Sequence, residues 1–537
     1  MSVLVSGSFS KEIDRFAIVK LGMPSLELME RASEGLSEKA EGLLKHDSSA
    51  CILVVSGMGN NGADGLNAAY ILRERGYGDI RIAAVGDPDK RTEEFRYHED
   101  RLKALGVSME MIRDEEELSG FDPGMPALII DALFGIGLRR EVRGVFLSAI
   151  CLINRLRDEK GCLVLSADVP SGLDSDLGRN LCGDISPVRA HGTVTFGFDK
   201  TGLWLGSGPL LRGRLWVHDI GYPEDILDKI PHDIYDVTER SDVFIKDLEH
   251  RLRHRGPGAN KSTYGKALII AGSPGMAGAA YLSGLSALKS GIGMARYFGP
   301  EENRIILQTL LPEAMYDAYG PAGKTDPDTM KERLHSAFSW ADHFILGPGL
   351  SCSEDAEEIV RAFAGLWKED QSLEEPKKKL LVIDADGLNI LSGHPELREK
   401  LLGERTIITP HVGEMARLTG SSIAKIKEDP LRIAREFALS QDTGVILKDA
   451  VTVISDCIGR LFVNTEGSAA LAKAGSGDVL TGAVCGVCAV LSDDITAGMP
   501  TAVCLHGRAG SLASRGISEH GTLARETAEA LPKAFSG

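Results

Sequence analysis

The chain has 537 residues, too many for one ordinary hydrophobic core, and two large α/β units are the simplest solution. Its 60 Lys and Arg against 77 Asp and Glu give a net charge of −17, which disfavours nucleic acid or an anionic membrane as the main partner. Nine cysteines scattered through apolar runs predict a reducing, cytoplasmic setting, and no uninterrupted apolar segment is long enough to predict a membrane span.

The first half of the chain repeats an order of strand, small-residue turn and helix. Apolar residues at helical spacing over residues 10–32, interrupted at residues 22–24, predict two helices joined by a turn. An apolar strand at residues 51–56 precedes the turn GMGNNGADG and a helix expected at residues 66–75. Further strands, which complete the pattern of a doubly wound parallel sheet, are expected at residues 80–85, 127–131 and 163–168.

Polar side chains gather where three of these strands end. Ligands collect at the carboxyl ends of strands in a doubly wound sheet, so these side chains predict a binding site. An Asx-turn at the first strand end and turn capping at the other two remain the alternatives on local sequence alone. The clusters are Asn60, Asn61 and Asp64, then Asp131 before Gly135-Ile136-Gly137, and then Asp168 with Ser171.

The second half follows a stretch without periodicity, residues 222–243, which predicts a linker. Its strands are expected at residues 267–271, 344–346, 380–384, 406–408 and 445–448, with a small-residue helix at 280–291. The carboxylates of Asp384 and Asp386 predict either a magnesium neighbourhood or turn capping. His411, between a strand and a helix expected at residues 413–418, is interpreted as a ligand contact rather than a structural residue.

The most informative stretch of the second half is NTEGSAALAKAGSGDVLTG, residues 464–482. Residues 474–477 leave no large side chain to block a phosphate, and a helix that starts near Asp478 offers unpaired N–H groups and a positive dipole end. Asp478 would then lie close enough to a bound hydroxyl to take its proton. Because Gly-Ser-Gly-Asp is also an ordinary helix start, Asp478 as a simple N-cap is the alternative.

Taken together, these motifs resemble two known enzyme domains. NNGADG, DALFGIGL, ADVPSGLD and TFGFDKTGL resemble the NAD(P)H-hydrate epimerase domain. KSTYGKALIIAGS, GPGL, VIDADGLNIL, TPHVGEMARL and AGSGDVLTG follow one another as in the ADP- or ATP-dependent NAD(P)H-hydrate dehydratases, which are ribokinase-like. The resemblance implies a Rossmann-like three-layer sandwich at residues 1–222, a linker at 223–243 and a ribokinase-like domain at 244–537.

For the first domain, the resemblance implies a set of ligand contacts around Asp168, which would act as acid or base. Asn61, Asp131 and Ser171 would hold a potassium ion. Two positions depart from the family pattern, with Ala63 in place of the usual glycine and Ile136 in place of the usual threonine. The implied substrate contacts are Asn60, Asn61, Gly62, Ala63, Asp64, Gly135, Ile136, Gly137, Leu138, Arg139, Arg140, Glu141 and Asp168.

For the second domain, the resemblance implies that Asp478 is the base and that Gly475, Ser476 and Gly477 hold the transferring phosphoryl group. Magnesium would accompany the nucleotide. The run KDAVT stands where the family commonly has KGAGT, which makes this nucleotide contact the least certain. The implied substrate contacts are Ala279, Gly349, His411 and Asp478, and the implied nucleotide contacts are Lys448, Asp449, Ala450, Val451, Thr452 and Gly477.

The function implied by the resemblance is repair of hydrated nicotinamide cofactors. The first domain would interconvert the R and S epimers of NADHX and NADPHX, and the second would dehydrate the S epimer with ADP, which gives AMP and phosphate, or with ATP. We expect a homo-oligomer. The alternative is a small-molecule kinase, for a vitamin precursor or a sugar, fused to a nucleotide-binding domain without catalytic activity.

Overall fold

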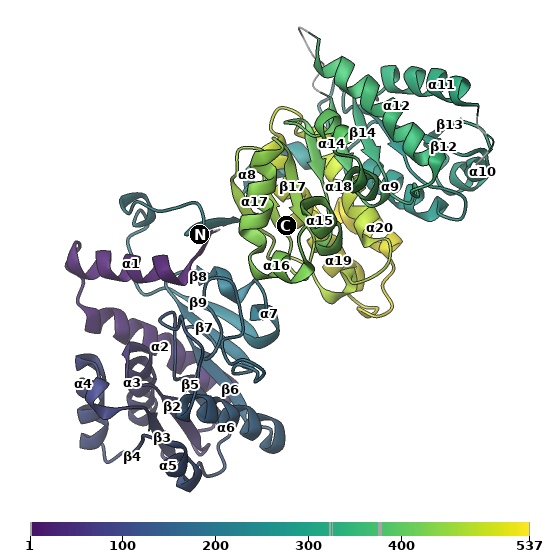
Figure 1. Ribbon diagram of the computed structural model, residues 1–537. Helices are drawn as coiled ribbons and strands as arrows, with labels where there is room; N and C mark the ends of the chain where they lie inside the picture. The colour runs from purple at the N-terminus through teal and green to yellow at the C-terminus, as the bar shows by residue number, and fades with distance from the viewer. Residues whose placement is uncertain (1–2, 322–323, 325, 374–378, 536–537) are drawn as a thin grey trace. The chain divides into compact units, whose positions relative to one another are not determined.

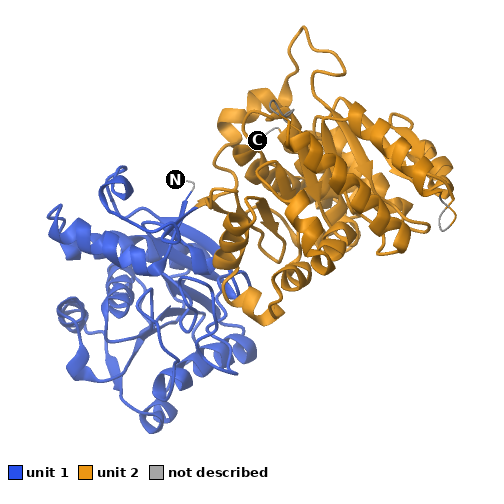
Figure 2. Cartoon of the chain, turned by 45° about the horizontal axis from the view of Figure 1, so that its top comes forward, with its two compact units in different colours: residues 1, 3–238 blue, residues 2, 239–537 orange. Residues whose placement is uncertain are grey.

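The computed structural model describes residues 3–321, 324, 326–373 and 379–535. They form two compact units that divide after Thr238, and each unit is described here by itself (Figures 1 and 2). Within these described ranges, no helix is both long enough and apolar enough to cross a membrane.

The first unit is built on a parallel sheet. Its strands are β2 (Ile52–Ser56), β3 (Ile80–Val85), β4 (Met109–Ile112), β5 (Leu128–Ala132), β6 (Leu163–Ala167), β7 (Gly192–Phe196) and β9 (Arg214–His218). They lie in the order β4-β3-β2-β5-β6-β7-β9. The chain therefore runs outward from β2 to β4, returns, and starts again at β5, which makes the boundary between β2 and β5 the switch point where such sheets bind ligands.

Helices cover both faces of this sheet, which confirms the predicted three-layer sandwich. Val54 and Ile130 are paired across β2 and β5 and pack against α2, α3 and α4, whereas the neighbouring pair Leu53 and Ile129 packs against α5 and α6. This alternation follows from the two-residue period of a strand. The helices of this unit are α1 (Gly7–Val19), α2 (Ser25–Leu43), α3 (Asn60–Glu74), α4 (Glu93–Ala104), α5 (Glu115–Gly120), α6 (Val145–Lys160) and α7 (Gly208–Leu211), with short 3₁₀ turns η1 (Pro88–Lys90), η2 (Thr201–Leu203) and η3 (Leu227–Lys229).

The helix expected at residues 66–75 begins earlier, at Asn60, so the segment read as a glycine-rich turn is largely the first turn of α3. The glycines of this turn let α3 pack closely against Gly57 and against β5. A Cβ on Gly62 would lie 1.8 Å from the Gly57 carbonyl oxygen, and one on Gly65 would lie 2.5 Å from the Ala132 Cβ. Ala63 adopts a helical backbone with negative φ and is fully buried, so its departure from glycine does not strain the chain.

Residues 222–243, expected as a linker with little apolar surface, pack instead on the first unit over their first half. Ile226 and Ile230 are buried against Phe9 and Ile13 of α1. A second local feature also holds α1, because the short strand β1 (Val3–Val5) just before it pairs in parallel with β8 (Asp199–Lys200). The expectation of a free linker was therefore wrong for residues 222–230.

The second unit has a larger sheet in the order β13-β12-β11-β14-β15-β16-β17-β18-β19, parallel from β13 to β17 and antiparallel beyond. The chain runs outward from β11 to β13 and restarts at β14, so β11 and β14 form its switch point. The strands are β11 (Lys266–Ile270), β12 (Met294–Gly299), β13 (Met315–Ala318), β14 (His343–Leu346), β15 (Leu380–Ile383), β16 (Thr406–Ile408), β17 (Gly444–Leu447), β18 (Val453–Ser455) and β19 (Leu461–Val463), with β10 (Val237–Arg240) paired to β19 through Glu239 and Arg240.

One face of this sheet is covered by α9, α18, α19 and α20, which share a continuous apolar core. The small residues of α9 and α18 let these two helices approach closely, because a Cβ on Gly482 would lie 2.0 Å from Ser286 Oγ. The helices are α8 (Ile245–Arg253), α9 (Ala277–Lys289), α10 (Glu301–Leu310), α11 (Pro327–Trp340), α12 (Glu354–Gln371), α13 (Asp386–Gly393), α14 (Pro395–Leu401), α15 (Val412–Thr419), α16 (Ile423–Glu428), α17 (Pro430–Ser440), α18 (Ser476–Val490), α19 (Ile495–Ser514) and α20 (Ala524–Ala534), with the 3₁₀ turn η4 (Ala469–Leu471).

Candidate active sites

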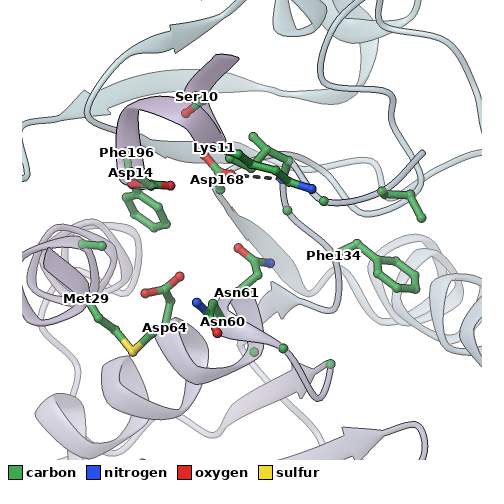
Figure 3. Close-up of a pocket in the computed structure, with 18 of the residues that line it drawn as sticks. Ser10, Lys11, Asp14, Met29, Asn60, Asn61, Asp64, Phe134, Asp168 and Phe196 are labelled. Atoms are coloured by element: carbon green, nitrogen blue, oxygen red, sulfur yellow. Dashed lines mark hydrogen bonds between the residues drawn. The ribbon is translucent and has the colours of Figure 1, made fainter. Parts of the chain in front are cut away.

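The first unit contains a cavity of about 870 Å³ at the switch point of its sheet (Figure 3). Its walls come from α1, the first turn of α3, the loop after β5, Asp168 after β6, and the segment that carries Lys200 and Tyr222. Most of the substrate contacts implied by the resemblance line this cavity. Two do not: Ala63 faces the core, and the Glu141 carboxylate pairs with Arg143 at the surface, 2.6 Å away.

Asp168 is the most constrained residue of the cavity. It has a positive φ of 65°, a strained conformation for a side chain of this kind, and its N–H donates to the Val194 carbonyl oxygen at 2.7 Å. Its Oδ1 lies 2.9 Å from Lys200 Nζ and accepts from Thr195 Oγ1 at 3.1 Å, and its Oδ2 accepts from the Ile136 N–H at 3.3 Å. These donors fix the orientation of the carboxylate.

Lys200 is a residue that sequence reasoning did not single out. Its side chain is 1% exposed, and its ammonium also donates to the Phe196 carbonyl oxygen at 2.7 Å. The available signal was its place in TFGFDKTGL, directly after an aspartate in an otherwise apolar run. A buried lysine almost always has a partner, and here the partner is Asp168.

Asp131 is fully buried beside the same cavity, and burial raises the pKa of its carboxyl. Its oxygens accept from Ser171 Oγ at 2.6 Å, from Ser166 Oγ at 2.8 Å and from the Ser171 N–H at 2.9 Å, all neutral donors. The third residue implied for potassium, Asn61, has a buried Nδ2 with no hydrogen-bond partner in the part of the chain that the structure describes. Its Oδ1 would lie 2.9 Å from a Cβ on Gly135, so only glycine allows this approach.

Two further carboxyl groups face the cavity. The pKa of Asp14 on α1 is raised, mainly by burial. The pKa of Asp64 on α3 is raised well above its usual range, first by burial and then by the negative charge of Asp168. The hydroxyl of Tyr222 donates a hydrogen bond to Asp14. Asp14 and Tyr222 carried no signal in the sequence, because one lies on an ordinary amphipathic helix and the other in the expected linker.

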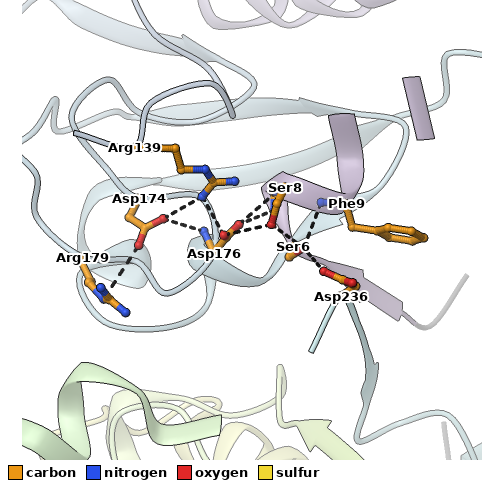
Figure 4. A network of polar contacts seen from close by, with 9 residues as sticks. Ser6, Ser8, Phe9, Arg139, Asp174, Asp176, Arg179 and Asp236 are labelled. Atoms are coloured by element: carbon orange, nitrogen blue, oxygen red, sulfur yellow. Dashed lines mark hydrogen bonds and ion pairs between the residues drawn. The ribbon is translucent and has the colours of Figure 1, made fainter. Parts of the chain in front are cut away.

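A polar network ties the rim of the cavity to the start of α1 (Figure 4). Arg139 donates to Asp176 Oδ2 at 2.7 Å, and Asp176 Oδ1 accepts from the Gly7 and Ser8 N–H groups at 2.6 and 3.3 Å. Ser6 is the N-cap of α1 and accepts from the Phe9 N–H. Asp176 therefore satisfies free donors at the helix start, and Arg139 is linked through it to the helix that carries Lys11 and Asp14.

In the second unit, Asp478 is the third residue of α18, whose N-cap is Gly475 with a φ of 90° and no side-chain cap. The N-cap of α18 is therefore Gly475, and the interpretation of Asp478 as the N-cap was wrong. Burial raises its pKa to about 7, the negative charge of Asp384 adds to this, and Lys448 opposes it. A carboxyl with a pKa near the working pH is suited to accept a proton as a general base.

Lys448 and Asp384 lie beside this helix start. Lys448 Nζ is 2.7 Å from Asp384 Oδ1, and Thr481, one turn into α18, donates to Asp384 Oδ2 at 2.6 Å. A Cβ on Gly477 would lie 3.4 Å from Lys448 Nζ. A phosphate at the helix start would thus meet backbone N–H groups and a lysine ammonium together.

The two carboxylates predicted as a magnesium neighbourhood or as turn caps are both engaged by the protein. Asp386 Oδ2 accepts from the Ser351 N–H at 2.8 Å, which is a capping role, while Asp384 is held by Lys448 and Thr481. Among the described residues, there is no group of three or more His, Cys, Asp or Glu side chains placed to hold a metal ion.

His411 has a structural role that we did not expect. It is the N-cap of α15, and its Nδ1 accepts from the Gly413 and Glu414 N–H groups at 2.9 and 3.3 Å while Glu414 Oε2 accepts from the His411 N–H. Burial, then the charges of Lys448 and Arg417, lower its pKa, which suits a ring nitrogen that accepts hydrogen bonds. The side chain is 53% exposed, and its Nε2 lies 3.3 Å from Glu414 Oε1.

The remaining contacts predicted for the second unit lie in the first turn of α9 and in the loops that follow β14 and β17. A Cβ on Gly349 would lie 2.9 Å from the Ala279 Cβ, so these two residues meet at the switch point of β11 and β14. The turn that departs from the family pattern, residues 449–451, links β17 to β18, and the Asp449 carboxylate lies 3.3 Å from Lys427 Nζ. Its negative charge is therefore partly compensated.

His506 of α19 was not predicted as part of this site. It is 7% exposed, and it makes a hydrogen bond with the backbone of Ser476, the first residue of α18. Burial lowers its pKa to about 4. A single histidine in an apolar helix gives no signal in a sequence, since such residues are usually only packed in the core. Here it supports the turn that leads to Asp478.

Comparisons with known proteins give matches to both halves of the chain. A family described as NAD(P)H-hydrate dehydratase matches residues 267–533, and one described as YjeF-related protein N-terminus matches residues 25–202. The bifunctional NAD(P)H-hydrate repair enzyme of Thermofilum pendens is 35% identical over 98% of this chain and 94% of its own, and that of Moorella thermoacetica is 32% identical over 98% and 96%. The crystal structure of ADP/ATP-dependent NAD(P)H-hydrate dehydratase from Bacillus subtilis, co-crystallised with ATP and Mg²⁺, is 28% identical, with a TM-score of 0.44 over 54% of this chain and 96% of that one.

Proposed function

The chain belongs to the bifunctional NAD(P)H-hydrate repair enzymes, and on that premise we propose which of its residues carry out each step. The enzyme combines an epimerase, which interconverts R- and S-NAD(P)HX, with a dehydratase, which returns S-NAD(P)HX to NAD(P)H with ADP or ATP. The alternative of a small-molecule kinase is not favoured, because the relatives match both halves of the chain.

The position of Asp478 is the observation that carries the proposal for the dehydratase. Its carboxyl, with a pKa of about 7, lies in the first turn of α18 behind Gly475, Ser476 and Gly477. Asp478 takes the proton of the C6 hydroxyl, the hydroxyl oxygen attacks the terminal phosphorus of the nucleotide, and AMP leaves when the nucleotide is ADP. Phosphate then departs from C6 with the C–O electron pair, and C5 loses a proton to solvent, so that the C5=C6 double bond of the nicotinamide ring forms.

Lys448 and the backbone of α18 are suited to the nucleotide phosphates. The ammonium lies next to Gly477, and the helix start supplies free N–H groups and a positive dipole end. We assign Lys448, Asp449, Ala450, Val451, Thr452 and Gly477 to nucleotide binding, and Ala279, Gly349 and His411 with Asp478 to the hydrate.

Magnesium would enter with the nucleotide. Mg²⁺ usually keeps several waters and takes one or two carboxylates together with substrate phosphates, so a dedicated protein cage is not required. Asp384 and Asp386 are the available carboxylates, and both already have protein partners. When bound, the ion would reduce the charge of the phosphates, while Lys448 and the backbone orient them.

For the epimerase, we propose that Asp168 handles the proton of the C6 hydroxyl, with Lys200 holding its carboxylate in place through the 2.9 Å ion pair. The substrate contacts remain Asn60, Asn61, Gly62, Asp64, Gly135 to Arg140 and Asp168, all at the cavity, with Ala63 and Glu141 as weaker members of the set. Lys11 adds positive charge at the glycine loop, because a Cβ on Gly137 would lie 3.6 Å from its Nζ.

A potassium ion fits the group formed by Asn61, Asp131 and Ser171. Asp131 is a buried carboxyl whose hydrogen-bond partners are neutral, so a monovalent cation would balance its charge through hard oxygen ligands. Ser171 Oγ and the Asn61 Oδ1 are oxygens of the required kind. These residues would hold the ion at the edge of the cavity, where it would fix the loop after β5.

The proposal is tested by incubating the protein with a mixture of R- and S-NADHX. With ADP or ATP present, full recovery of NADH absorbance requires both activities, whereas recovery limited to the S fraction indicates the dehydratase alone. Repeating the assay with sodium or tetramethylammonium in place of potassium should slow conversion of the R fraction only. The expected homo-oligomer and the cytoplasmic setting stay predictions, and light scattering tests the first.

A further inference from the structure

The epimerase cavity holds two carboxyl groups in opposite circumstances. Asp168 is fully partnered, with Lys200, Thr195 and the Ile136 N–H around its oxygens. Asp64 is not: within the described ranges no donor lies in hydrogen-bond reach of its carboxyl. Figure 3 shows this group directed into the cavity beside Met29 and below Asn61.

The backbone holds Asp64 firmly even though its carboxyl is free. It lies one helical turn after Asn60 on α3, so both side chains project from the same face of the helix. Ser33 Oγ on α2 donates to the Asp64 carbonyl oxygen at 3.1 Å. The Asp64 carboxyl is therefore held in a defined position and is available for a hydrogen bond with a bound ligand.

We propose that Asp64 is the catalytic acid of the epimerisation, which gives a proton to the ring nitrogen and takes it back while Asp168 handles the proton of the C6 hydroxyl. This inference rests on the proposed epimerase function and extends it from substrate contact to a named chemical role.

The charges around Asp64 favour its protonated form. Burial raises its pKa well above the usual range, and the negative charges of Asp168, Asp14 and Glu94 raise it further. Four cationic side chains line the same cavity: the buried Lys200 is paired with Asp168, Arg139 is paired with Asp174 and Asp176, and Lys11 and Arg140 lie at the glycine loop. Two carboxyls in different surroundings, here Asp168 held by a cation and Asp64 without a hydrogen-bond partner among the described residues, are the usual basis for a base and an acid in one site.

The reaction balances with these two groups and no other reagent. C6 of the hydrate carries a hydroxyl and is bonded to the ring nitrogen. Asp168 accepts the hydroxyl proton, the C6=O bond forms, the C6–N bond breaks, and its electron pair goes to nitrogen, which receives the proton of Asp64. Rotation about the C5–C6 bond presents the other face of the aldehyde. Nitrogen then attacks C6, its proton returns to Asp64, and Asp168 returns its proton to oxygen.

Asp14 is the natural comparison, because it also faces the cavity and its pKa is also raised. Its oxygen, however, already accepts a hydrogen bond from the Tyr222 hydroxyl, and this hydrogen bond lowers its pKa. A partnered carboxyl on α1 is a poorer proton donor than an unpartnered one. Asp14→Asn is therefore the matched control.

The experiment uses the full chain and follows conversion of R- to S-NADHX, with the dehydratase assay on S-NADHX as an internal standard. Asp64→Asn replaces a neutral acid by a neutral amide of the same shape, so the protein should fold, which thermal unfolding checks. The amide cannot release a proton, and the epimerisation rate should fall about 10²- to 10⁴-fold with KM changed less than a few-fold. Asp14→Asn, whatever its rate, should keep the dependence of the epimerisation rate on pH that the parent shows at alkaline pH.

The pH profile separates an acid from a mere contact. In the parent, the rate of epimerisation should fall at high pH as Asp64 loses its proton, and Asp64→Asn should remove this alkaline limb. Asp64→Glu keeps a proton donor and should retain the limb with part of the rate. An Asp64→Asn variant within tenfold of the parent, or one with the parent's alkaline limb, would overturn the proposal. If the parent itself leaves R-NADHX unconverted, the proposed function fails instead.

Discussion

Lys448 and Asp384 form an ion pair of 2.7 Å directly beside the first turn of α18, where a Cβ on Gly477 would lie 3.4 Å from Lys448 Nζ and 3.9 Å from Asp384 Oδ2. The pair places a positive charge at the phosphate position and a negative charge near Asp478. Lys448 lowers the pKa of Asp478 and Asp384 raises it, so in the proposed site the same pair would act on both the nucleotide phosphates and the protonation of Asp478.

Lys448→Met should therefore have two separable effects. Nucleotide affinity should fall, because the ammonium beside the phosphates is lost. The pKa of Asp478 should rise above about 7, since the group that opposes the burial effect is gone, and the acid limb of the dehydration rate should move to higher pH. Single-turnover rates on S-NADHX across pH, at saturating nucleotide, measure this shift. An unchanged acid limb would show that Lys448 does not act on the base.

Asp478→Asn tests the base directly. It keeps the size and hydrogen-bonding shape but cannot accept the hydroxyl proton, so the single-turnover rate on S-NADHX should fall about 10²- to 10⁴-fold. Nucleotide affinity should change little or improve slightly, because a negative charge near the phosphates has gone. A rate within tenfold of the parent would leave Asp478 as a structural residue only.

The Asp478→Asn variant should also change how the stability of the second unit depends on pH. The pKa of Asp478 in the folded protein, about 7, is higher than in the unfolded chain. Its contribution to the free energy of unfolding is therefore fully present below pH about 4 and is lost as pH rises through 7. Each unit of pKa shift corresponds to about 1.4 kcal/mol before solvent screening. Asp478→Asn should thus raise the melting temperature of the second unit more at pH 8 than at pH 5. Asp449→Asn, at an exposed carboxylate, should show no such difference.

Asp168→Asn should abolish conversion of R- to S-NADHX and leave dehydration of the S epimer intact. Lys200→Met should also impair the epimerase and, in addition, destabilise the first unit, because it leaves a nearly buried carboxylate without its cation. Breaking a buried pair in this way typically costs about 3 to 5 kcal/mol. Thermal unfolding and both activity assays distinguish the variants. Equal loss of both activities in Asp168→Asn would mean that the sites are misplaced.

Cutting the chain after Thr238 should give two soluble fragments, each with its own activity, because each unit has its own core. A first fragment that ends at Tyr222 should be less stable than one that ends at Thr238, since it loses the buried Ile226 and Ile230. Chemical denaturation of the two fragments tests this. Loss of either activity in folded fragments would argue against independent units.

The order of strands, turns and helices was predictable because its signals are local: apolar runs of strand length followed by small residues. The start of α3 was not. Gly and Asn favour turns by local preference, and the reason for their place inside a helix is tertiary, since Gly62 and Gly65 must pass close to Gly57 and to β5. The capping role of His411 is local, to Gly413 and Glu414, but histidine is not among the usual N-cap residues.

The composition of the sites was only partly predictable. Asp168 and Asp478 follow strands or small-residue turns and so carry a signal in the sequence. Lys200, Asp14 and Tyr222 gain their roles from contacts across long stretches of chain, such as the hydrogen bond between residues 14 and 222, and local patterns hold no trace of them. His506 reaches Ser476 in the same way.

The wall that α1 adds to the epimerase cavity changes what counts as the smallest working epimerase. The segment that matches the family pattern, residues 25–202, contains every motif that identifies the domain, yet it omits Lys11, Asp14 and Tyr222. A protein trimmed to that segment would keep its recognisable sequence and open its cavity to water on one side. For this half of the enzyme, the segment that identifies the family is therefore shorter than the segment that encloses the cavity.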